Sequence, residues 1–240
     1  MIRAAAIATA SGERGLGDLR LPLDLDALLP GAGPWVVELG FGKGRYLLRQ
    51  ALERPGHRFL GIEVANEYWR RVARAIQRRR LGNLAAIRGE ALFLISAVLP
   101  RGFAREVHVY FPDPWPKTRH RKRRLFDPQT VDLVLGMLRP DGELSFATDF
   151  EEYGEAVEDL LRGYPGLEVE RREEPWPEGP RTNYEAKFGR EGRPIVRLVA
   201  RRAARLAAHH PAAAEGLLVA GRREAQEAPV EISPAAPGTR

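Results

Sequence analysis

Short apolar runs alternate with helical segments along the middle of the chain. Five runs of four to six residues have the length and boundaries of strands: 35–39, 59–63, 84–87, 107–111 and 143–148. Each is followed by a segment with the apolar spacing of an amphipathic helix: 45–53, 66–80, 91–99, 128–138 and 151–162. Five strand–helix repeats predict an α/β fold, with a parallel sheet covered by helices on both faces.

The two ends of the chain have different patterns. Segments 167–171 and 195–200 are predicted as two final strands without a long helix between them, so a hairpin with one antiparallel edge strand is expected. Residues 1–34 show no periodicity and end in a Pro/Gly cluster, which predicts an irregular N-terminal extension. The folded domain is therefore expected over 35–202, and 203–240, rich in Ala, Pro and Arg, as a partly disordered tail.

Composition narrows the class of protein. The 240 residues are 44% hydrophobic with a mean hydropathy of -0.35, which is typical of a soluble domain. Cysteine is absent, which excludes disulfides and thiolate metal sites. The first ten residues lack an apolar run of signal-peptide strength, and no run approaches 18 apolar residues, so a cytoplasmic protein without membrane spans is expected.

Positive charge is concentrated in one segment. The net charge of +6 and pI of about 9.9 suit a polyanionic partner, nucleic acid or an acidic membrane, although a GC-rich genome also raises arginine content. Six of the eight residues from Lys117 to Arg124 are Lys or Arg, which favours contacts to phosphates. A second set, Arg70, Arg74 and Arg78, falls on one helical face, and there a solvated surface is the preferred interpretation.

A glycine-rich loop follows the first predicted strand. The loop 38–44 reads Glu-Leu-Gly-Phe-Gly-Lys-Gly, and glycines allow sharp turns and close approach to a ligand. The dinucleotide fingerprint needs a third glycine where Arg45 stands, and the P-loop pattern also fails, so a nicotinamide oxidoreductase is disfavoured. Glu38 would repel a pyrophosphate but suits a cationic ligand such as S-adenosylmethionine, which carries an ammonium and a sulfonium.

Acids stand at the ends of three successive predicted strands. Glu38 stands at the end of the first, Glu63 ends the second about 20 residues after the glycine loop, and Glu90 follows the third. An acid at the second position can accept both ribose hydroxyls, and a polar side chain at the third could meet an adenine. Because ligands bind at the carboxyl ends of parallel strands, the three acids with Gly40, Gly42 and Gly44 predict one nucleoside pocket.

The fourth predicted strand ends in a rigid, chemically unusual loop. Residues 112–117 read Pro-Asp-Pro-Trp-Pro-Lys, and three prolines within five residues stiffen the backbone and remove amide donors. Such a loop can hold Asp113 and Trp115 at fixed positions, whereas its structural alternative is a rigid turn with the tryptophan as a core plug. The basic segment follows directly, so this loop is predicted to be the chemical centre.

These features resemble the bacterial tRNA (guanine-N7)-methyltransferases from about Trp35 to Arg201. The most specific segments are 111–124 and 181–188, the second with the Thr-x-x-Glu motif at Thr182 and Glu185; Thr148–Asp149 matches a further family position. Glu90 departs from the Asp or Asn usual in the family. The resemblance implies the class I methyltransferase fold, S-adenosylmethionine as methyl donor without a metal, and methylation at N7 of guanine 46 in the tRNA variable loop.

By the same resemblance, Asp113 is the catalytic acid, and the cofactor is bound by Glu38, Gly40, Gly42, Gly44, Glu63, Glu90 and Asp113. The substrate would be held by Lys117, Asp149, Thr182, Asn183, Tyr184 and Glu185. RNA contacts are expected from Arg119, His120, Arg121, Lys122, Arg123 and Arg124, and no obligatory protein partner or membrane is implied.

The chemistry expected at this site needs no general base. Guanine N7 carries a lone pair and no proton, so attack on a methyl group requires approach and orientation. A carboxylate such as Asp113 or Asp149 can stabilise the positive charge that develops on the ring, and Trp115 could stack on the base. Two alternatives stay open. One is a methyltransferase that modifies an amino nitrogen, although residues 115–117 depart from the Asp-Pro-Pro-aromatic loop that would suit this reaction. The other is an RNA-binding module without catalysis.

Overall fold

The computed structural model describes residues 6–15, 17, 20–128 and 130–202, without the side chains of 121 and 122. The part of the chain expected as a C-terminal tail, 203–240, lies outside the described residues. The strands are β1 Ala6–Thr9, β2 Gly12–Gly15, β3 Trp35–Leu39, β4 Arg58–Glu63, β5 Leu84–Arg88, β6 Ala104–Tyr110, β7 Leu138–Thr148, β8 Leu167–Arg171 and β9 Val196–Arg202. The helices are α1 Leu25–Leu28, α2 Arg45–Glu53, α3 Asn66–Arg79, α4 Ala91–Ala97, the 3₁₀ helix η3 Thr118–Arg123, α5 Val131–Gly136, α6 Glu151–Arg162 and α7 Asn183–Arg190.

The strands form one sheet in the order β2-β1-β5-β4-β3-β6-β7-β9-β8. The five central strands, β5, β4, β3, β6 and β7, pair in parallel, as the strand–helix alternation predicts. The order reverses at β3, since β4 and β5 lie on one side of it and β6 and β7 on the other. A reversal of this kind leaves a crevice at the carboxyl ends of the strands.

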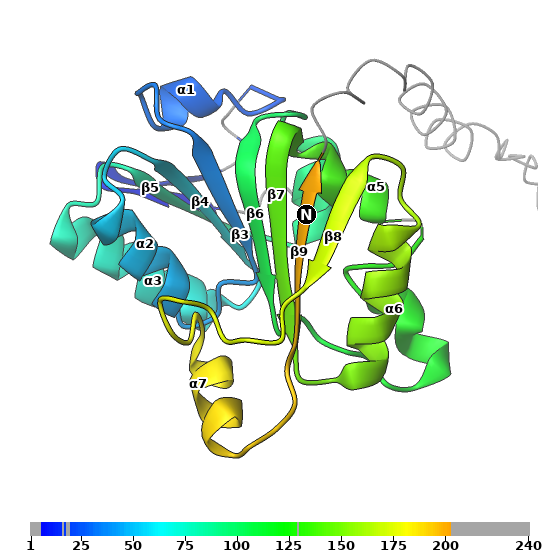
Figure 1. Cartoon of the computed structure of the whole chain (residues 1–240). Helices are drawn as coiled ribbons and strands as arrows, with labels where there is room; N and C mark the ends of the chain where they lie inside the picture. The colour runs from blue at the N-terminus through cyan, green and yellow to red at the C-terminus, as the bar shows by residue number, and fades with distance from the viewer. Residues whose placement is uncertain (1–5, 16, 18–19, 129, 203–240) are drawn as a thin grey trace, which may run out of the picture. The chain divides into compact units, whose positions relative to one another are not determined.

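Helices cover both faces of this sheet (Figure 1). On one face α2 and α3 pack through buried residues such as Leu47, Trp69 and Ile76. On the other, α4, α5 and α6 contribute Leu94, Val134 and other apolar residues to the larger core. The alternation along β3 follows from this, because Val36 belongs to the first core and its neighbours to the second. The predicted two-faced α/β architecture is confirmed.

The N-terminal segment is part of the sheet, which corrects the expectation of an irregular extension over 1–34. Strands β1 and β2 form an antiparallel hairpin, and β1 pairs antiparallel with β5. Ile7 and Ala8 are fully buried. Strands this short, built largely from small residues, carry no alternation strong enough to recognise; they are stabilised by pairing with a strand about 80 residues away. α1 likewise begins at an Asp24 cap within the segment expected to be irregular.

The C-terminal strands pair as expected but in a different order. β8 and β9 are antiparallel to each other, and β9 inserts between β7 and β8, so the antiparallel strand lies one position inside the edge. The connection between them also contains α7, which lies beyond the carboxyl ends of the parallel strands (Figure 1). The fourth predicted helix is shorter than expected: α5 begins after a Thr130 cap, and Asp127 accepts a hydrogen bond from the Thr130 amide at 3.0 Å.

Candidate active site

A cavity of about 500 Å³ opens at the carboxyl ends of β3, β4, β5 and β6, beside the first turn of α7. It collects residues from four separate loops and from α7. Its wall includes these residues singled out from the sequence: Glu38, Gly40, Gly42, Glu63, Glu90, Asp113, Trp115, Arg123, Thr182, Asn183 and Tyr184. The predicted nucleoside pocket and the predicted chemical centre therefore belong to one cavity.

The glycine loop after β3 binds the end of β4. Gly40 and Gly44 adopt left-handed backbone angles, with φ of 74° and 72°, and a Cβ on Gly44 would lie 2.4 Å from a methyl of Val72. The Gly42 amide donates a hydrogen bond of 2.8 Å to Glu63 Oε2, and the Ala65 amide donates one of 2.8 Å to Oε1. These two bonds fix the Glu63 carboxylate in the cavity wall. Gly44 itself lines a neighbouring groove rather than the cavity.

Glu38 is buried at the base of the cavity, with only 2% of its surface exposed. Its Oε2 atom is inaccessible to solvent and has no hydrogen-bond partner among the residues that the structure describes. Burial raises the pKa of this carboxyl to about 8, although a backbone hydrogen bond from Leu47 opposes the shift. A buried acceptor without a donor costs free energy, so the position favours a cationic or hydrogen-bonding ligand.

A buried polar network lies next to Glu38, and the sequence patterns do not predict it. The Tyr46 hydroxyl is hydrogen-bonded to His108 Nε2 at 3.0 Å, and His108 Nδ1 to the Tyr110 hydroxyl at 2.8 Å. Glu106 joins the network at His108 Nε2 and accepts a hydrogen bond of 3.0 Å from Arg54. Burial lowers the pKa of His108 to about 4, so the imidazole is neutral near pH 7.

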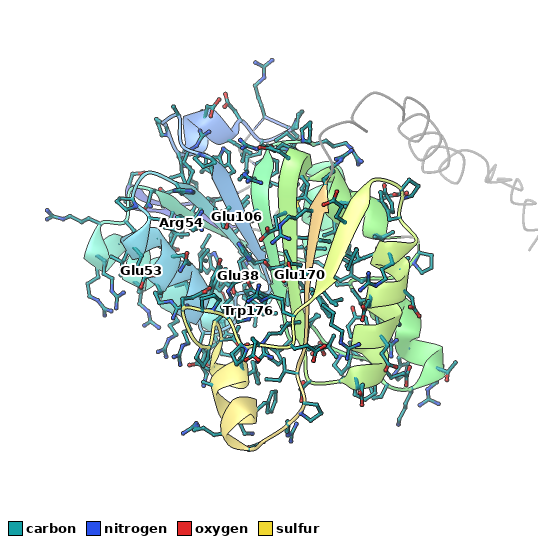
Figure 2. The ribbon with its side chains drawn as sticks, in the orientation of Figure 1. Glu38, Glu53, Arg54, Glu106, Glu170 and Trp176 are labelled. Atoms are coloured by element: carbon teal, nitrogen blue, oxygen red, sulfur yellow. The ribbon has the colours of Figure 1, made fainter. Side chains whose placement is uncertain are left out.

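The Arg181 guanidinium packs against the aromatic rings of this network. Its guanidinium carbon lies 3.8 Å from the Trp176 ring centroid and 5.3 Å from that of Tyr46, both within cation–π range. The same side chain donates hydrogen bonds to the Tyr110 hydroxyl and to Glu178. Figure 2 shows Glu38 and Trp176 near the ends of the strands, and Arg54 with Glu106 further along the sheet. Polar residues on β3 and β6 are thus held in fixed positions on the α2 side of the sheet.

Glu90 lines the cavity and also caps a helix. It is the N-cap of α4, where its carboxylate oxygens accept hydrogen bonds from the amides of Leu92, at 3.0 Å, and Phe93, at 2.7 Å. A carboxylate at this position satisfies two free amides and interacts favourably with the helix dipole. Glu90 lines the same cavity as Glu63.

The proline-rich loop holds its aromatic and acidic residues in a strained backbone. Phe111 and Trp115 have positive φ angles of 53° and 41°, a region that costs non-glycine residues about 1–3 kcal/mol. Asp113 is exposed on the cavity wall between them. Trp115 packs against the Arg123 guanidinium, 5.1 Å from the ring centroid, and the edge of His120. Trp115 therefore lines the cavity and is no core plug.

Arg124 lies inside the protein, which separates it from the other cations expected to contact RNA. It is 5% exposed, donates a hydrogen bond of 2.7 Å to the Pro114 carbonyl and lies 4.7 Å from the Tyr153 ring centroid. These contacts anchor the proline-rich loop on α6. Lys117 and Arg119 are exposed, and neither lies on the cavity wall. The side chains of Arg121 and Lys122 lie outside the described part of the structure.

The Thr-x-x-Glu segment forms the beginning of α7. Thr182 is its N-cap and accepts a hydrogen bond of 3.0 Å from the Glu185 amide, and Thr182, Asn183 and Tyr184 line the cavity. Glu185 lies beneath the helix instead, 3% exposed, with one oxygen bonded to Arg197 Nε at 2.8 Å and the other to the Arg181 amide. Direct contact of Glu185 with a substrate would require it to leave both partners.

Asp149 also lies off the cavity wall. Its carboxylate forms an ion pair of 2.9 Å with Arg193, which packs on Phe188 of α7. The contact links the end of β7 to the end of α7. Among the expected site residues, Asp149, Glu185 and Arg124 thus position the loops around the cavity, while Glu38, Glu63 and Asp113 line it.

Comparison with known proteins places this architecture among methyltransferases. Residues 32–198 match a family described as putative methyltransferase. The tRNA (guanine-N(7)-)-methyltransferase of Alkalilimnicola ehrlichii is 38% identical over 75% of this chain and 78% of its own length. That of Nitrosococcus oceani is 36% identical over 71% of this chain and 72% of its own.

Solved structures share the fold at lower identity. The 16S rRNA methyltransferase KamB superposes with a TM-score of 0.60 at 13% identity, over 82% of this chain and 99% of that chain. A variant 16S rRNA (adenine(1408)-N(1))-methyltransferase from Catenulisporales acidiphilia, solved with cosubstrate SAM, gives a TM-score of 0.53 at 17% identity, over 82% and 96% of the two chains. Within the described residues, no helix is both long and apolar enough to cross a membrane.

Proposed function

The chain belongs to the tRNA (guanine-N(7)-)-methyltransferase family, and on this basis we propose that it transfers a methyl group from S-adenosylmethionine to N7 of a guanine in tRNA. The family resemblance drawn from the sequence motifs is thereby confirmed. The observation that carries the proposal is the presence, in one cavity, of the exposed Asp113 and the buried Glu38, whose Oε2 atom has no hydrogen-bond partner among the described residues. The first suits a cationic cofactor and the second a base that becomes positively charged.

The residues of the cavity fit S-adenosylmethionine. When bound, this cofactor supplies an electrophilic methyl group on a sulfonium. Glu38 would hold its cationic amino-acid part, because an orphaned buried carboxylate oxygen gains most from a charged donor. Glu63, oriented by the amides of Gly42 and Ala65, has lone pairs left to accept the ribose hydroxyls. Glu90 would accept from the adenine amino group, its two oxygens being held by the start of α4.

Asp113 and Trp115 would act on the guanine. N7 needs no deprotonation, so the contribution of the protein is orientation and charge stabilisation. Asp113, fixed between two prolines, accepts hydrogen bonds from the guanine edge and stabilises the positive charge of the product ring. Trp115 stacks on the base, and its own orientation is maintained by Arg123 and His120. The strained φ angles of this loop are consistent with such a preorganised role.

The choice of tRNA guanine is the most specific part of the proposal. By family resemblance the target is guanine 46 of the variable loop. Exposed cations next to the cavity, Arg119 and Arg123, support a polyanionic substrate. A base stacked within folded tRNA must first be moved out of the stack, and Trp115 can replace the stacking partner that is lost.

The decisive experiment is incubation of unmodified tRNA with labelled S-adenosylmethionine, followed by strand cleavage specific for 7-methylguanine. Label in tRNA with cleavage at position 46 is expected. Label at an adenine or at an amino nitrogen would contradict the proposal.

Asp113→Asn tests the role of the carboxylate, because the amide keeps the size but removes the charge. We expect kcat to fall about 100-fold or more, as for loss of one preorganised electrostatic group, with the affinity for S-adenosylmethionine within a few-fold of wild type. Turnover near the wild-type level by the folded variant would refute the assignment.

A further inference from the structure

A second groove, of about 670 Å³, runs between α2 and α3 beside the cavity. Seven of its twelve lining residues are Lys or Arg and none is acidic. Lys43 precedes α2, and the arginines come from both helices: Arg45, Arg49, Arg71, Arg74, Arg78 and Arg79. Sequence periodicity places Arg70, Arg74 and Arg78 on one face of α3, which alone is typical of a solvated surface. In the structure Arg74 and Arg78 line the groove together with Arg71 and Arg79, whereas Arg70 does not. The tertiary structure adds that this face meets the arginines of α2.

Few counterions neutralise these charges. Among the described residues, Arg49 has one ion pair, a long one of 4.0 Å to Glu53, and its Nη1 atom donates a hydrogen bond of 3.5 Å to the Glu178 carbonyl. Its Nε and Nη2 atoms are shielded from solvent and have no hydrogen-bond partner in this part of the chain. In the described part of the chain, Arg71, Arg74 and Arg78 form no ion pair. Like charges brought together without counterions repel each other, and shielded guanidinium donors without acceptors are costly. An arrangement of this kind is stabilised when an anionic ligand provides the acceptors.

The groove is continuous with the cavity. Lys43, Arg45 and Asn183 line both, and Arg45 Nη1 donates a hydrogen bond of 3.4 Å to Asn183 Oδ1 at the boundary. From there Arg71, Arg74 and Arg78 extend about 10 Å along α3, given a rise of about 1.5 Å per helical residue. Leu52, 50% exposed, provides an apolar surface between the charges. A nucleic acid strand whose base enters the cavity would meet this groove as it leaves.

We propose that the α2–α3 groove binds the sugar–phosphate backbone of the tRNA next to the target guanine, with Arg71, Arg74 and Arg78 on phosphates and Leu52 against a ribose. The inference rests on the proposed function, since it extends the tRNA site of the same cavity. Guanidinium groups contact phosphate oxygens in any sequence, so the groove contributes affinity and orientation without base specificity. It is a binding surface, separate from the groups that touch the reacting base.

The test compares two triple variants with equal loss of charge. The groove variant lacks three groove cations and carries Arg71→Gln, Arg74→Gln and Arg78→Gln. The control variant lacks three cations near the amino ends of β6 and β7, away from the groove, and carries Arg101→Gln, Arg105→Gln and Arg139→Gln. Binding of unmodified tRNA is measured by fluorescence anisotropy from about 50 to 200 mM salt. Each phosphate contact contributes about 0.7–0.9 to the log–log salt slope. Raising the salt over this range lowers the affinity of both proteins for tRNA. The factor by which affinity falls should be about 20- to 40-fold smaller for the groove variant than for wild type.

Kinetics and footprinting complete the test. The groove variant should raise KM for tRNA at least about 10-fold, with kcat at saturating tRNA and S-adenosylmethionine affinity unchanged. Hydroxyl-radical protection should disappear from one backbone segment flanking the target guanine. The control variant should behave as wild type within about two-fold.

Several results would overturn the inference. One is a salt slope and KM equal in the two triple variants. Another is loss of binding to anionic phosphatidylserine vesicles by the groove variant with tRNA binding intact, which would make the groove a membrane site. If wild type binds tRNA but transfers no methyl group, the proposed function fails while the binding comparison still tests the groove.

Discussion

Replacing Glu38 by Gln should stabilise the free protein while weakening its cofactor site. Glu38 is 2% exposed, and its Oε2 atom has no hydrogen-bond partner within the described part of the chain. Burial raises the pKa of the carboxyl to about 8 from an ordinary value of 4.5. In the unfolded chain this carboxyl ionises near pH 4.5, but in the fold it retains its proton until about pH 8. The folded state therefore binds more protons between these values, and stability decreases as pH rises.

The expected magnitude follows from the two pKa values. Glutamine has the size of the protonated acid and never ionises, so the two proteins should be about equally stable below pH 4.5. With about 1.36 kcal/mol for each unit of pKa shift, the free energy of unfolding of Glu38→Gln should exceed that of wild type by about 2 kcal/mol at pH 6 and about 3 kcal/mol at pH 7. Above pH 8 the difference should level off near 5 kcal/mol.

The assay is urea unfolding of both proteins without cofactor from pH 5 to 9, paired with calorimetric titration of S-adenosylmethionine. Binding of a cation next to Glu38 favours its ionised form, so wild-type affinity should increase up to about ten-fold per pH unit below pH 8. Glu38→Gln should bind weakly and without this pH dependence. A variant that is less stable than wild type by the same amount at every pH would refute the reasoning, because it would mean that the native carboxylate is charged and paired.

Two further predictions distinguish Trp115, which lines the cavity, from Glu185, which is buried beneath α7. Trp115→Ala should lower kcat/KM for tRNA about 5- to 150-fold, the equivalent of a stacking contact of about 1–3 kcal/mol, with S-adenosylmethionine affinity unchanged in calorimetry; an unchanged kcat/KM would exclude stacking on the base. Glu185→Gln should cost about 3–5 kcal/mol in urea unfolding, because the Arg197 charge stays buried without its partner. The exposed Glu191→Gln is its control and should cost under about 1 kcal/mol, and equal losses would contradict a buried structural pair.

The parallel part of the sheet could be predicted because its signal is local. Each of the five central strands is an apolar run buried on both faces, and each following helix carries its own apolar stripe. The hairpin β1–β2 carries no such signal. Ala6–Thr9 is a strand because β5 offers an edge to pair with and because Ile7 fills the core, and both causes are tertiary. The insertion of β9 inside β8 is tertiary for the same reason, since spacing along the chain does not give the order of strands.

The positions of the motifs predicted the location of the site. They were a poorer guide to the contacts of each residue. Glu38, Glu63 and Asp113 follow strand ends, and the parallel topology brings such ends together. The Thr-x-x-Glu motif and the basic segment each contain residues that line the cavity and residues that are buried as structural supports. The amino-acid sequence alone does not distinguish the two. Thr182 faces the cavity while Glu185, three residues on, is buried against Arg197. Arg123 lines the cavity, while the buried Arg124 donates a hydrogen bond to the Pro114 carbonyl.

The unsatisfied groups of the molecule identify its ligands more directly than the motifs do. Among the described residues, Glu38 Oε2 is a buried acceptor without a donor, and Arg49 Nε and Nη2 are shielded donors without an acceptor; the first lines the cavity and the second the groove. Each is unfavourable in the free protein and becomes favourable with a partner of opposite charge. The acidic group is enclosed in a cavity that admits a small cation, and the basic groups line an open groove that admits a chain of anions. A methyl donor carrying positive charge and a polynucleotide carrying negative charge meet both requirements, and Asn183, which lines both sites, marks where the polynucleotide would pass from the groove to the cavity.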